Sequence, residues 1–259
     1  MYHDVVPRAE RDRAGFPGPV AGAYKLEPAA FSAHLDAIAR AGVELGLFGE
    51  REQATLTFDD GGASAVRIAQ ELELRGVRGM FFVVTGRIGT PGFLDADGVR
   101  ELAARGHEVG SHSHTHPPYM GRLGAAELAE EWTRSRELLA ELLGSPPMSA
   151  AAPGGSVSDE LIKQVAQAGY AQLFTSTPRA LQVGHSGIDL IGRYTIWAKD
   201  PPELAAALAA GARGPRARRL LAWQLKSAAK RISPSVYEAA RSAWAGRPSA
   251  ARNDASRSI

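Results

Sequence analysis

The sequence predicts an α/β protein in which strands and helices alternate, as a (β/α) barrel requires. Apolar runs of strand length recur along the chain, stretches with helical spacing of apolar residues lie between them, and polar clusters follow two of the predicted strands. A chain of 259 residues is long enough for one barrel domain with a well-buried core. We therefore expect residues 1–210 to form a single barrel.

The first predicted elements are a strand at residues 54–58, a helix at residues 63–75 and a strand at residues 79–84. The helix carries its apolar residues on one stripe and ends before Gly76. The second strand is continuously apolar, which is typical of a strand that is covered on both faces.

Two further helices are predicted later in the chain. One carries apolar residues at helical spacing from Leu128 onward and stops before Gly144. Trp132 lies on this stripe, so we expect it to pack in the core or a groove rather than to bind a sugar. The other helix opens at Ser158 with acids in its first turn and ends at Gly169.

The last fifty residues differ from the rest of the chain in charge. Residues 211–252 carry ten Lys or Arg and one acid, whereas residues 1–210 carry 19 basic and 26 acidic residues. We expect residues 211–245 to form basic helices that pack on the barrel or face an anionic membrane surface, and residues 246–259 to be disordered. Few aromatic residues accompany the cations, which argues against nucleic-acid binding. The apolar face of the predicted helix consists of Leu221, Leu225, Ala228 and Ile232.

The composition limits which kinds of site the chain can form and where in the cell we expect the protein. The chain has no cysteine, so neither disulfides nor thiolate metal sites can form. No apolar run is long enough for a signal peptide or a membrane span, which predicts a cytoplasmic protein. Met1 lies almost on the Tyr-His pair at residues 2–3, which would make a strand there unusually short; a start upstream of Met1 could add residues, including an export signal.

Two polar clusters form a candidate metal site. Residues 57–62 read Thr-Phe-Asp-Asp-Gly-Gly, and residues 111–117 read Ser-His-Ser-His-Thr-His-Pro. Each follows a predicted strand, and catalytic groups of such barrels lie at the carboxyl ends of the strands. Carboxylates and imidazoles at these positions predict metal-assisted hydrolysis, although Asp-Asp-Gly-Gly alone is also a common turn sequence.

The spacing of the histidines limits which of them can share one ion. His112 and His116 would lie ~13 Å apart in an extended strand at ~3.3 Å per residue, too far for two metal bonds of ~2.1 Å. Both can bind one ion only if the chain coils directly after the strand, and His114 then points away. The third ligand should come from the Asp59-Asp60 pair. The other acid would then act as a base on water that the ion activates.

These clusters resemble signature motifs of a known family. Residues 57–61 and 112–117 look like the first two motifs of the metal-dependent polysaccharide deacetylases, the NodB-homology or carbohydrate esterase family 4 type. The resemblance runs to about residue 195. It implies a distorted, incomplete (β/α) TIM-like barrel that removes N-acetyl groups from amino-sugar glycans. Segments that resemble the opening of bacterial members are residues 1–5, 31–35 and 40–42.

The resemblance also implies roles for matching residues. Asp59 resembles the catalytic base, and Asp60, His112 and His116 resemble the metal ligands. Asp and His ligands suit Zn²⁺, which we expect here, but also Co²⁺, Ni²⁺ or Fe²⁺.

The third family motif, Arg-x-Pro-x-Gly, reads Ala-Ala-Pro-Gly-Gly at residues 151–155. The backbone N–H of Gly154 could still hold the oxyanion, where such a donor is worth ~3–4 kcal/mol. Ala151 stands in place of the arginine that orients the base in the family. Either another cation substitutes for that arginine or Asp59 is less well held.

The fourth and fifth family motifs do not match. The family has an Asp and a Trp near residues 171–174, but no carboxylate follows there. It also has a Leu-x-His whose imidazole protonates the leaving amine, but residues 188–194 contain no histidine. The candidate general acids are His3 and His185. General acid catalysis raises the reaction rate by ~10²–10⁴-fold.

We therefore expect a metal-dependent hydrolase that removes N-acetyl groups from an amino-sugar glycan or its precursor. A cytoplasmic location favours a lipid-linked or small glycan, with the basic C-terminal helix available for contact with the inner membrane face. Two alternatives stay open: a hydrolase of non-sugar C–N bonds on the same scaffold, and a glycan-binding accessory protein with weak catalysis.

Overall fold

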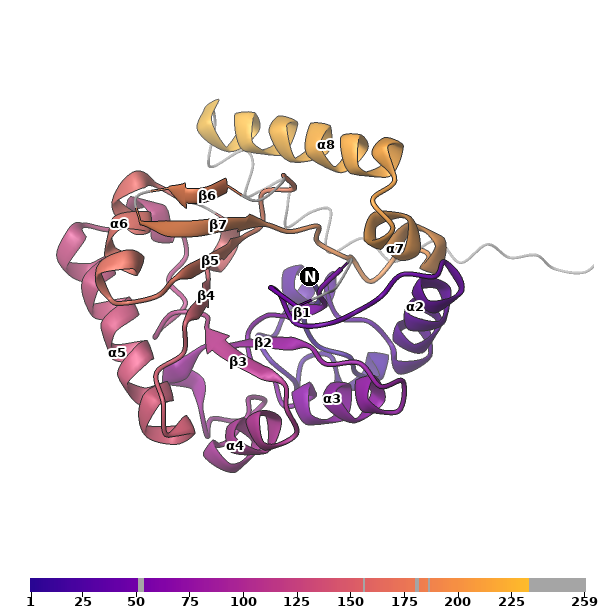
Figure 1. Ribbon diagram of the computed structural model, residues 1–259, viewed down its shortest axis with the longest axis horizontal. Helices are drawn as coiled ribbons and strands as arrows, with labels where there is room; N and C mark the ends of the chain where they lie inside the picture. Colours follow the sequence, from indigo (N-terminus) through magenta and orange to yellow (C-terminus); the bar gives the residue numbers. More distant parts are fainter. Residues whose placement is uncertain (51–53, 156, 180–181, 186, 233–259) are drawn as a thin grey trace, which may run out of the picture.

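In the described part of the chain a seven-stranded sheet curls through the molecule, and helices cover its outer surface (Figure 1). The strand order is β1-β2-β3-β4-β5-β7-β6; all neighbours are parallel except β6, which runs antiparallel to β7. The strands are β1 (Thr57–Phe58), β2 (Met80–Val83), β3 (Glu108–Ser111), β4 (Ser149–Ala151), β5 (Gln172–Thr175), β6 (Gln182–His185) and β7 (Ile188–Gly192). The computed structural model describes residues 1–50, 54–155, 157–179, 182–185 and 187–232.

The sequence explains how these strands are placed. All four residues of β2 (Met-Phe-Phe-Val) are buried, as expected for the continuously apolar run at residues 79–84. β1 is shorter than the strand predicted at residues 54–58, because Ala54 forms an isolated bridge with Leu45 instead.

Local capping signals set the ends of several helices. The Ser158 hydroxyl accepts a hydrogen bond from the N–H of Leu161 at 3.2 Å and so caps α6. Gly144 adopts the left-handed conformation that ends α5. The α-helices are α1 (Pro19–Gly22), α2 (Pro28–Arg40), α3 (Ala65–Glu73), α4 (Ala96–Ala104), α5 (Ala125–Leu143), α6 (Asp159–Gln167), α7 (Pro202–Ala209) and α8 (Arg213–Ile232). Short 3₁₀ helices are η1 (Arg8–Glu10), η2 (Thr85–Arg87), η3 (Met120–Arg122) and η4 (Pro153–Gly155).

Residues from both ends of the barrel region meet at the β1 edge of the sheet. Tyr2 pairs with Phe58 in a parallel bridge, and its N–H donates to Thr57 O at 2.7 Å. The chain that follows β7 lies on the other side of the N-terminal residues, where Ile196 N–H donates to Met1 O at 2.9 Å. This return of the chain links the two sides of the curled sheet and confirms the expected distorted, incomplete (β/α) barrel.

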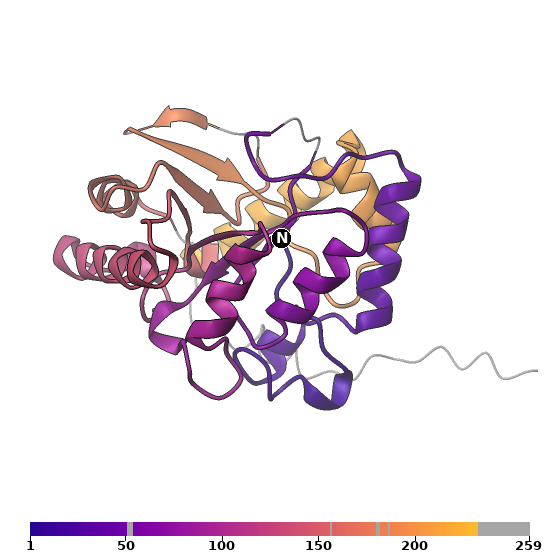
Figure 2. The same cartoon turned by 60° about the horizontal axis from the view of Figure 1, so that its bottom comes forward.

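Aromatic side chains are prominent in the core. Phe58 and Phe81 stack on neighbouring strands with ring centroids 4.9 Å apart. Trp132 of α5 is 0% exposed and packs edge-on against Tyr170, so it is a core residue rather than a sugar-binding one. On the outside, α2 packs alongside α7 (Figure 2).

The C-terminal helix α8 turns a different face to the barrel from the one that the sequence predicts. Leu221 and Leu225 are 57% and 65% exposed, so this part of the apolar face points outward, while α8 packs on the barrel through its other side. The barrel-facing side instead carries Arg216, which donates to Leu208 O, and Arg219, which pairs with Asp200.

Two other expectations concern the C-terminal part of the chain. The expected disordered tail at residues 246–259, and residues 233–245 before it, lie outside the described residues. Among the helices of residues 1–232 that the structure describes, none has the length and apolarity of a membrane span.

Candidate metal centre and its cleft

A cleft with a volume of about 1080 Å³ lies at the carboxyl ends of the strands. Asp59 and Asp60 follow β1, His112 follows β3, Gly154 lies in η4 after β4, and Arg193 follows β7. All five line the cleft, because the strands are parallel and their carboxyl ends therefore share one side of the barrel. The structure thus brings together residues from segments that span more than half of the chain.

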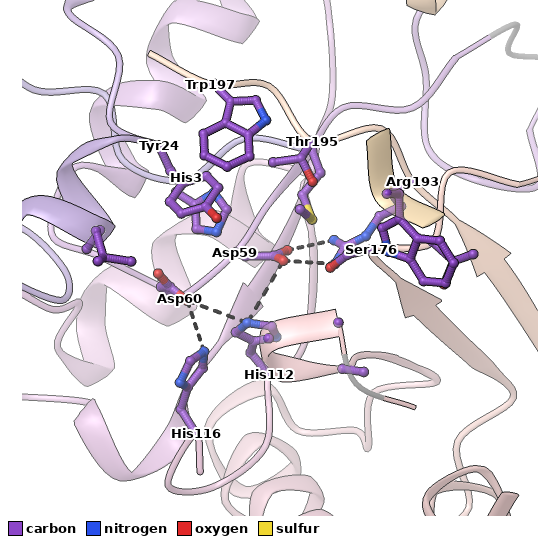
Figure 3. Close-up of a pocket in the computed structure, with 18 of the residues that line it drawn as sticks. His3, Tyr24, Asp59, Asp60, His112, His116, Ser176, Arg193, Thr195 and Trp197 are labelled. Carbon is purple, nitrogen blue, oxygen red and sulfur yellow. Dashed lines mark hydrogen bonds and ion pairs between the residues drawn. The ribbon is translucent and has the colours of Figure 1, made fainter. Parts of the chain in front are cut away.

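The side chains of Asp60, His112 and His116 converge on one point of this cleft (Figure 3). Asp60 Oδ1 lies 3.5 Å from His112 Nε2 and 3.6 Å from His116 Nε2. The three potential ligand atoms all lie within 4.8 Å of one another. Two ligands at ~2.1 Å from a tetrahedral ion are ~3.4 Å apart. The arrangement of the trio therefore fits a single divalent ion.

The backbone bends sharply where the trio is formed. Asp60, Ser113 and His116 have positive φ angles of 78°, 64° and 60°, which are uncommon for residues other than glycine. His116 N–H donates to Ser113 Oγ at 3.1 Å and so closes a turn directly after β3. This turn is the coil that the spacing of His112 and His116 requires, and such strain is often found at functional sites.

Glu131 of α5 holds the histidine loop in place. Its carboxylate accepts hydrogen bonds from the N–H of His114 at 2.9 Å and of Thr115 at 2.8 Å, and from the Thr115 hydroxyl. The His114 ring itself contacts the Thr85 hydroxyl at 3.0 Å and stands outside the trio, as expected. The role of Glu131 was not predicted from the sequence. The signal for it there is an acid on the apolar stripe of a predicted helix.

The orientation of the His112 ring is fixed from behind. Its Nδ1 lies 2.8 Å from the carbonyl oxygen of Ala151. Because a carbonyl can only accept, Nδ1 carries the proton, and the Nε2 lone pair is left to face Asp60. Fixing the far nitrogen in this way is typical of metal-binding histidines. The backbone at Ala151 therefore still serves the site, although its side chain is too short to do so.

The electrostatics of the trio favour a positive charge at its centre. Burial raises the pKa of Asp60, but the neighbouring histidines outweigh burial and hold that pKa well below its ordinary value. Burial, together with the nearby His112, lowers the pKa of His116 to about 4, so His116 is neutral at pH 7 and its lone pair is available. Burial opposes protonation of His112 as well, but the carboxylates of Asp59 and Asp60 raise its pKa.

Arg193 binds Asp59 through a buried, bidentate ion pair. Its Nη1 lies 2.6 Å from Asp59 Oδ1 and its Nη2 lies 2.8 Å from Asp59 Oδ2. Burial raises the pKa of Asp59, but the charges of Arg193 and of His112 lower it below its ordinary value. Asp59 is thus a carboxylate at neutral pH. Of the two possibilities left open by Ala151, the structure shows the first: another cation takes the place of the missing arginine.

The guanidinium of Arg193 is held on all sides. Nη1 also donates to the Thr57 hydroxyl at 3.1 Å, and Nε donates to Thr175 O at 3.3 Å. The guanidinium carbon lies 5.3 Å from the ring centroid of Phe82 and 5.9 Å from that of Phe174. The signal in the sequence was an arginine directly after an apolar strand, in the segment where a histidine is expected.

His3 lines the same cleft and lies on its aromatic side (Figure 3). Its ring centroid is 4.8 Å from that of Tyr24, which stacks on Trp197 at 4.6 Å. The Nδ1 atom of His3 is buried without a hydrogen-bond partner among the described residues. The other candidate acid, His185, ends the edge strand β6; its side chain lies outside the described part of the structure, so its role stays a prediction.

Gly154 exposes its backbone to the cleft in a left-handed conformation, with φ of 62°. The adjoining loop after β5 contributes Ser176 and Thr177 to the cleft, without a carboxylate.

A family model described as polysaccharide deacetylase matches residues 49–173. This segment contains both aspartates, both histidines of the trio and Gly154. Over this segment, which is just under half of its length, the chain resembles the polysaccharide deacetylase family. A curated relative, the peptidoglycan-N-acetylglucosamine deacetylase PgdA of Listeria monocytogenes, is 29% identical over 117 residues, which are 44% of this chain. The match spans only 24% of the length of that relative.

Solved structures of deacetylases share the fold. A polysaccharide deacetylase from Bacillus cereus superposes with a TM-score of 0.67 at 20% identity, over 81% of this chain and 67% of the other. IcaB from Ammonifex degensii gives a TM-score of 0.63 at 24% identity, over 81% of this chain and 94% of the other. Both likenesses confirm the deacetylase-type barrel.

The family segment leaves out several residues that line the cleft. His3, Arg193 and the residues of α8 lie before or after residues 49–173. The polysaccharide deacetylase motifs therefore account for the trio and for Asp59, whereas the partner of Asp59 and one wall of the cleft come from other parts of the chain.

Proposed function

We propose that this protein is a metal-dependent hydrolase that removes N-acetyl groups from an amino-sugar glycan or its precursor. The observation that carries the proposal is the trio of Asp60, His112 and His116 beside a carboxylate that Arg193 keeps ionised, in one cleft. The family and the name of the Listeria relative support an N-acetylated amino sugar as the substrate class.

The trio, Asp59 and Gly154 each have a role in this reaction. A divalent cation, Zn²⁺ by the chemistry of the donors, would be held by the trio and would supply a Lewis acid that polarises the acetamide carbonyl and activates water. Asp59, 3.9 Å from His112 Nε2, takes a proton from the attacking water. The Gly154 N–H stabilises the oxyanion. The C–N bond then breaks and acetate is released.

His3 is the group that we assign as the proton donor to the leaving amine. It lines the cleft and lies close enough to Asp60 for its charge to lower the pKa of that carboxyl. Replacement by glutamine, which cannot donate a proton in the same way, should lower kcat by ~10²–10⁴-fold with little change in KM. A His3→Gln variant with unchanged kcat would remove His3 from this role.

Acetate release from amino-sugar oligomers, measured on protein of determined metal content, tests the proposed function. We expect release in the metal-loaded protein and its loss in Asp59→Asn. Oligomers that bind without any release, even after metal is added and also in Asp59→Asn, would identify a glycan-binding accessory protein. Turnover of small linear or cyclic amides, but of no N-acetyl sugar, would identify the other type of C–N hydrolase.

The outer face of α8 supports a second part of the proposal, contact with the cytoplasmic membrane surface during the deacetylation of a lipid-linked glycan. Leu221 and Leu225 are exposed one turn apart, and α8 carries seven Lys or Arg and no acid. We expect the protein to sediment with vesicles rich in phosphatidylglycerol but not with pure phosphatidylcholine. Sedimentation that persists in Leu221→Ser/Leu225→Ser would contradict a role for this face.

A further inference from the structure

The cleft extends beyond the metal centre into a second cavity beneath α8. This second cavity has a volume of about 530 Å³. It shares four lining residues with the main cleft, so the two spaces adjoin: Val157, Thr177, Trp223 and Ser227. The main cleft alone, at about 1080 Å³, slightly exceeds the ~300–1,000 Å³ of pockets that enclose a drug-sized ligand. A single N-acetylated sugar would leave much of this combined space unfilled.

The boundary between the two cavities is formed by α8 on one side and by two loops on the other. Trp223 and Ser227 are four residues apart on α8 and therefore lie on one face of the helix. Val157 follows η4, which carries Gly154, and Thr177 follows β5. A ligand that extends from the metal centre into the second cavity must therefore pass Trp223.

The chemistry around Trp223 fits a sugar better than an acyl chain. An indole offers a flat face with negative electrostatic potential, on which the C–H face of a pyranose can stack. Besides the apolar Val157, Leu190 and Ala228, the second cavity is lined by Thr175, Thr177, Ser227 and Gln224, whose side chains carry hydroxyl or amide groups. Such groups can satisfy the hydroxyls of a sugar, whereas an acyl chain would leave them without hydrogen bonds when it covers them.

The first half of α8 is anchored to the barrel. Arg216 donates twice to Leu208 O, at 3.2 and 3.0 Å, and its guanidinium carbon lies 5.2 Å from the ring centroid of Tyr194. Arg219 pairs with Asp200, whose carboxylate also accepts from the N–H of Trp197 at 2.8 Å. Asp200 therefore ties α8 to the turn that carries an aromatic residue of the main cleft.

We propose that α8 adds a sugar-binding subsite to this enzyme, with the Trp223 indole as the platform for a sugar unit next to the one that is deacetylated. The preferred substrate is then an oligosaccharide or glycan chain rather than a single amino sugar. This inference rests on the proposed deacetylase function. Because α8 lies outside residues 49–173, the family resemblance alone does not predict it.

The test compares substrates of different length on the zinc-loaded protein of 259 residues. The probes are N-acetylglucosamine and its β-1,4- and β-1,6-linked dimers and tetramers, with acetate release as the readout. We expect kcat/KM to rise at least ~10-fold from the monomer to the tetramer of the preferred linkage. Trp223→Ala should remove most of this rise and so affect the tetramer far more than the monomer, while Trp223→Phe keeps most of it.

A binding measurement separates recognition from catalysis. In the Asp59→Asn background, calorimetric titration with the tetramer should give a Kd that Trp223→Ala weakens ~10-fold. Arg213→Ala, an exposed position in the first turn of the same helix, is the control and should change neither the Kd nor the rate.

The possible outcomes lead to different conclusions. Equal kcat/KM for all lengths, or a Trp223→Ala effect of equal size on monomer and tetramer, overturns the subsite but not the deacetylase. If no sugar releases acetate, the proposed function fails, and the binding titration alone decides on the subsite. Displacement of the tetramer by a polyprenyl phosphate, dependent on Trp223, would assign the second cavity to a lipid carrier and overturn the sugar assignment.

Discussion

The two walls of the cleft are built in different ways. On the ligand wall, formed by Asp60, His112 and His116, a turn of four residues and strained backbone angles place the two histidines. On the opposite wall, the critical contact joins Arg193 to Asp59 across 134 residues of sequence. An ion fixes the distances between its ligands within a few tenths of an ångström, so that wall tolerates little change. A base needs only a cation at its carboxylate, and any neighbouring strand can deliver one.

The largest effect should come from removing the metal from the ligand wall. After treatment with dipicolinate, acetate release should fall by at least ~10³-fold, because the carbonyl and the water both lose their activation. Zn²⁺ or Co²⁺ should restore it, and circular dichroism should show the same fold before and after. Full activity in protein shown to be metal-free would contradict the assignment of this wall.

Replacing Arg193 by methionine should have the next largest effect, on both activity and stability. A buried carboxylate left without its partner costs about 3–5 kcal/mol of folding free energy, measurable by urea denaturation. Because Arg193 lowers the pKa of Asp59, its loss raises that pKa, and the acid limb of the pH profile of kcat/KM should move to higher pH.

The same ion pair makes a pH-dependent contribution to stability. The pKa of Asp59 is lowered in the folded protein, so the stabilisation is complete above the ordinary aspartate value of ~3.9 and is lost as the pH falls through the lowered value. Arg193→Lys is the matched control and should retain part of both effects. An acid limb that does not move in Arg193→Met would show that Asp59 is not the titrating base.

A smaller effect is expected from Glu131→Gln, which weakens the support of the ligand wall while all three ligands stay in place. A neutral amide accepts the two loop N–H groups less strongly than a carboxylate. Metal affinity, measured by competition with a chromophoric chelator, should fall ~10–100-fold. An unchanged affinity would show that the histidine loop does not depend on α5.

The smallest effect should follow His114→Ala. The His114 ring contacts Thr85 rather than the trio, so its loss removes one side-chain hydrogen bond, worth about 1 kcal/mol of stability. Metal content and kcat should stay within about threefold of the unchanged protein, whereas His116→Ala should lose the metal. Equal losses in the two variants would contradict the division of roles among the histidines.

The sequence allowed more of the fold and of the ligand wall to be predicted than of the opposite wall, for a physical reason. The apolar run of β2, the glycine after α5 and the His112 to His116 spacing are local patterns, and local patterns can be read from one chain. Arg193 and Glu131 act through contacts with residues that are distant in sequence, which only the packed structure brings near. The signals in their own neighbourhood, an arginine directly after an apolar strand and an acid on the apolar stripe of a helix, do not reveal those distant partners.

The orientation of α8 could not be predicted for a similar reason. Its apolar stripe suggested burial, but Arg216 and Arg219 find a carbonyl and a carboxylate on the barrel and turn the stripe outward. Hydrophobic pattern alone does not reveal which acceptors a helix will meet.

The distance in sequence between Asp59 and Arg193 has a consequence for biosynthesis. At translation rates of ~5–20 residues per second, the 134 residues between them take roughly 7–27 s to be made. During that time Asp59 cannot be buried together with the cation that compensates for its charge. The apolar strand β2 beside it also still needs cover on both faces. The catalytic pocket can therefore mature only when the last parallel strand docks, and a ribosome that stalls before Arg193 would release a chain that is a target for chaperones and proteases.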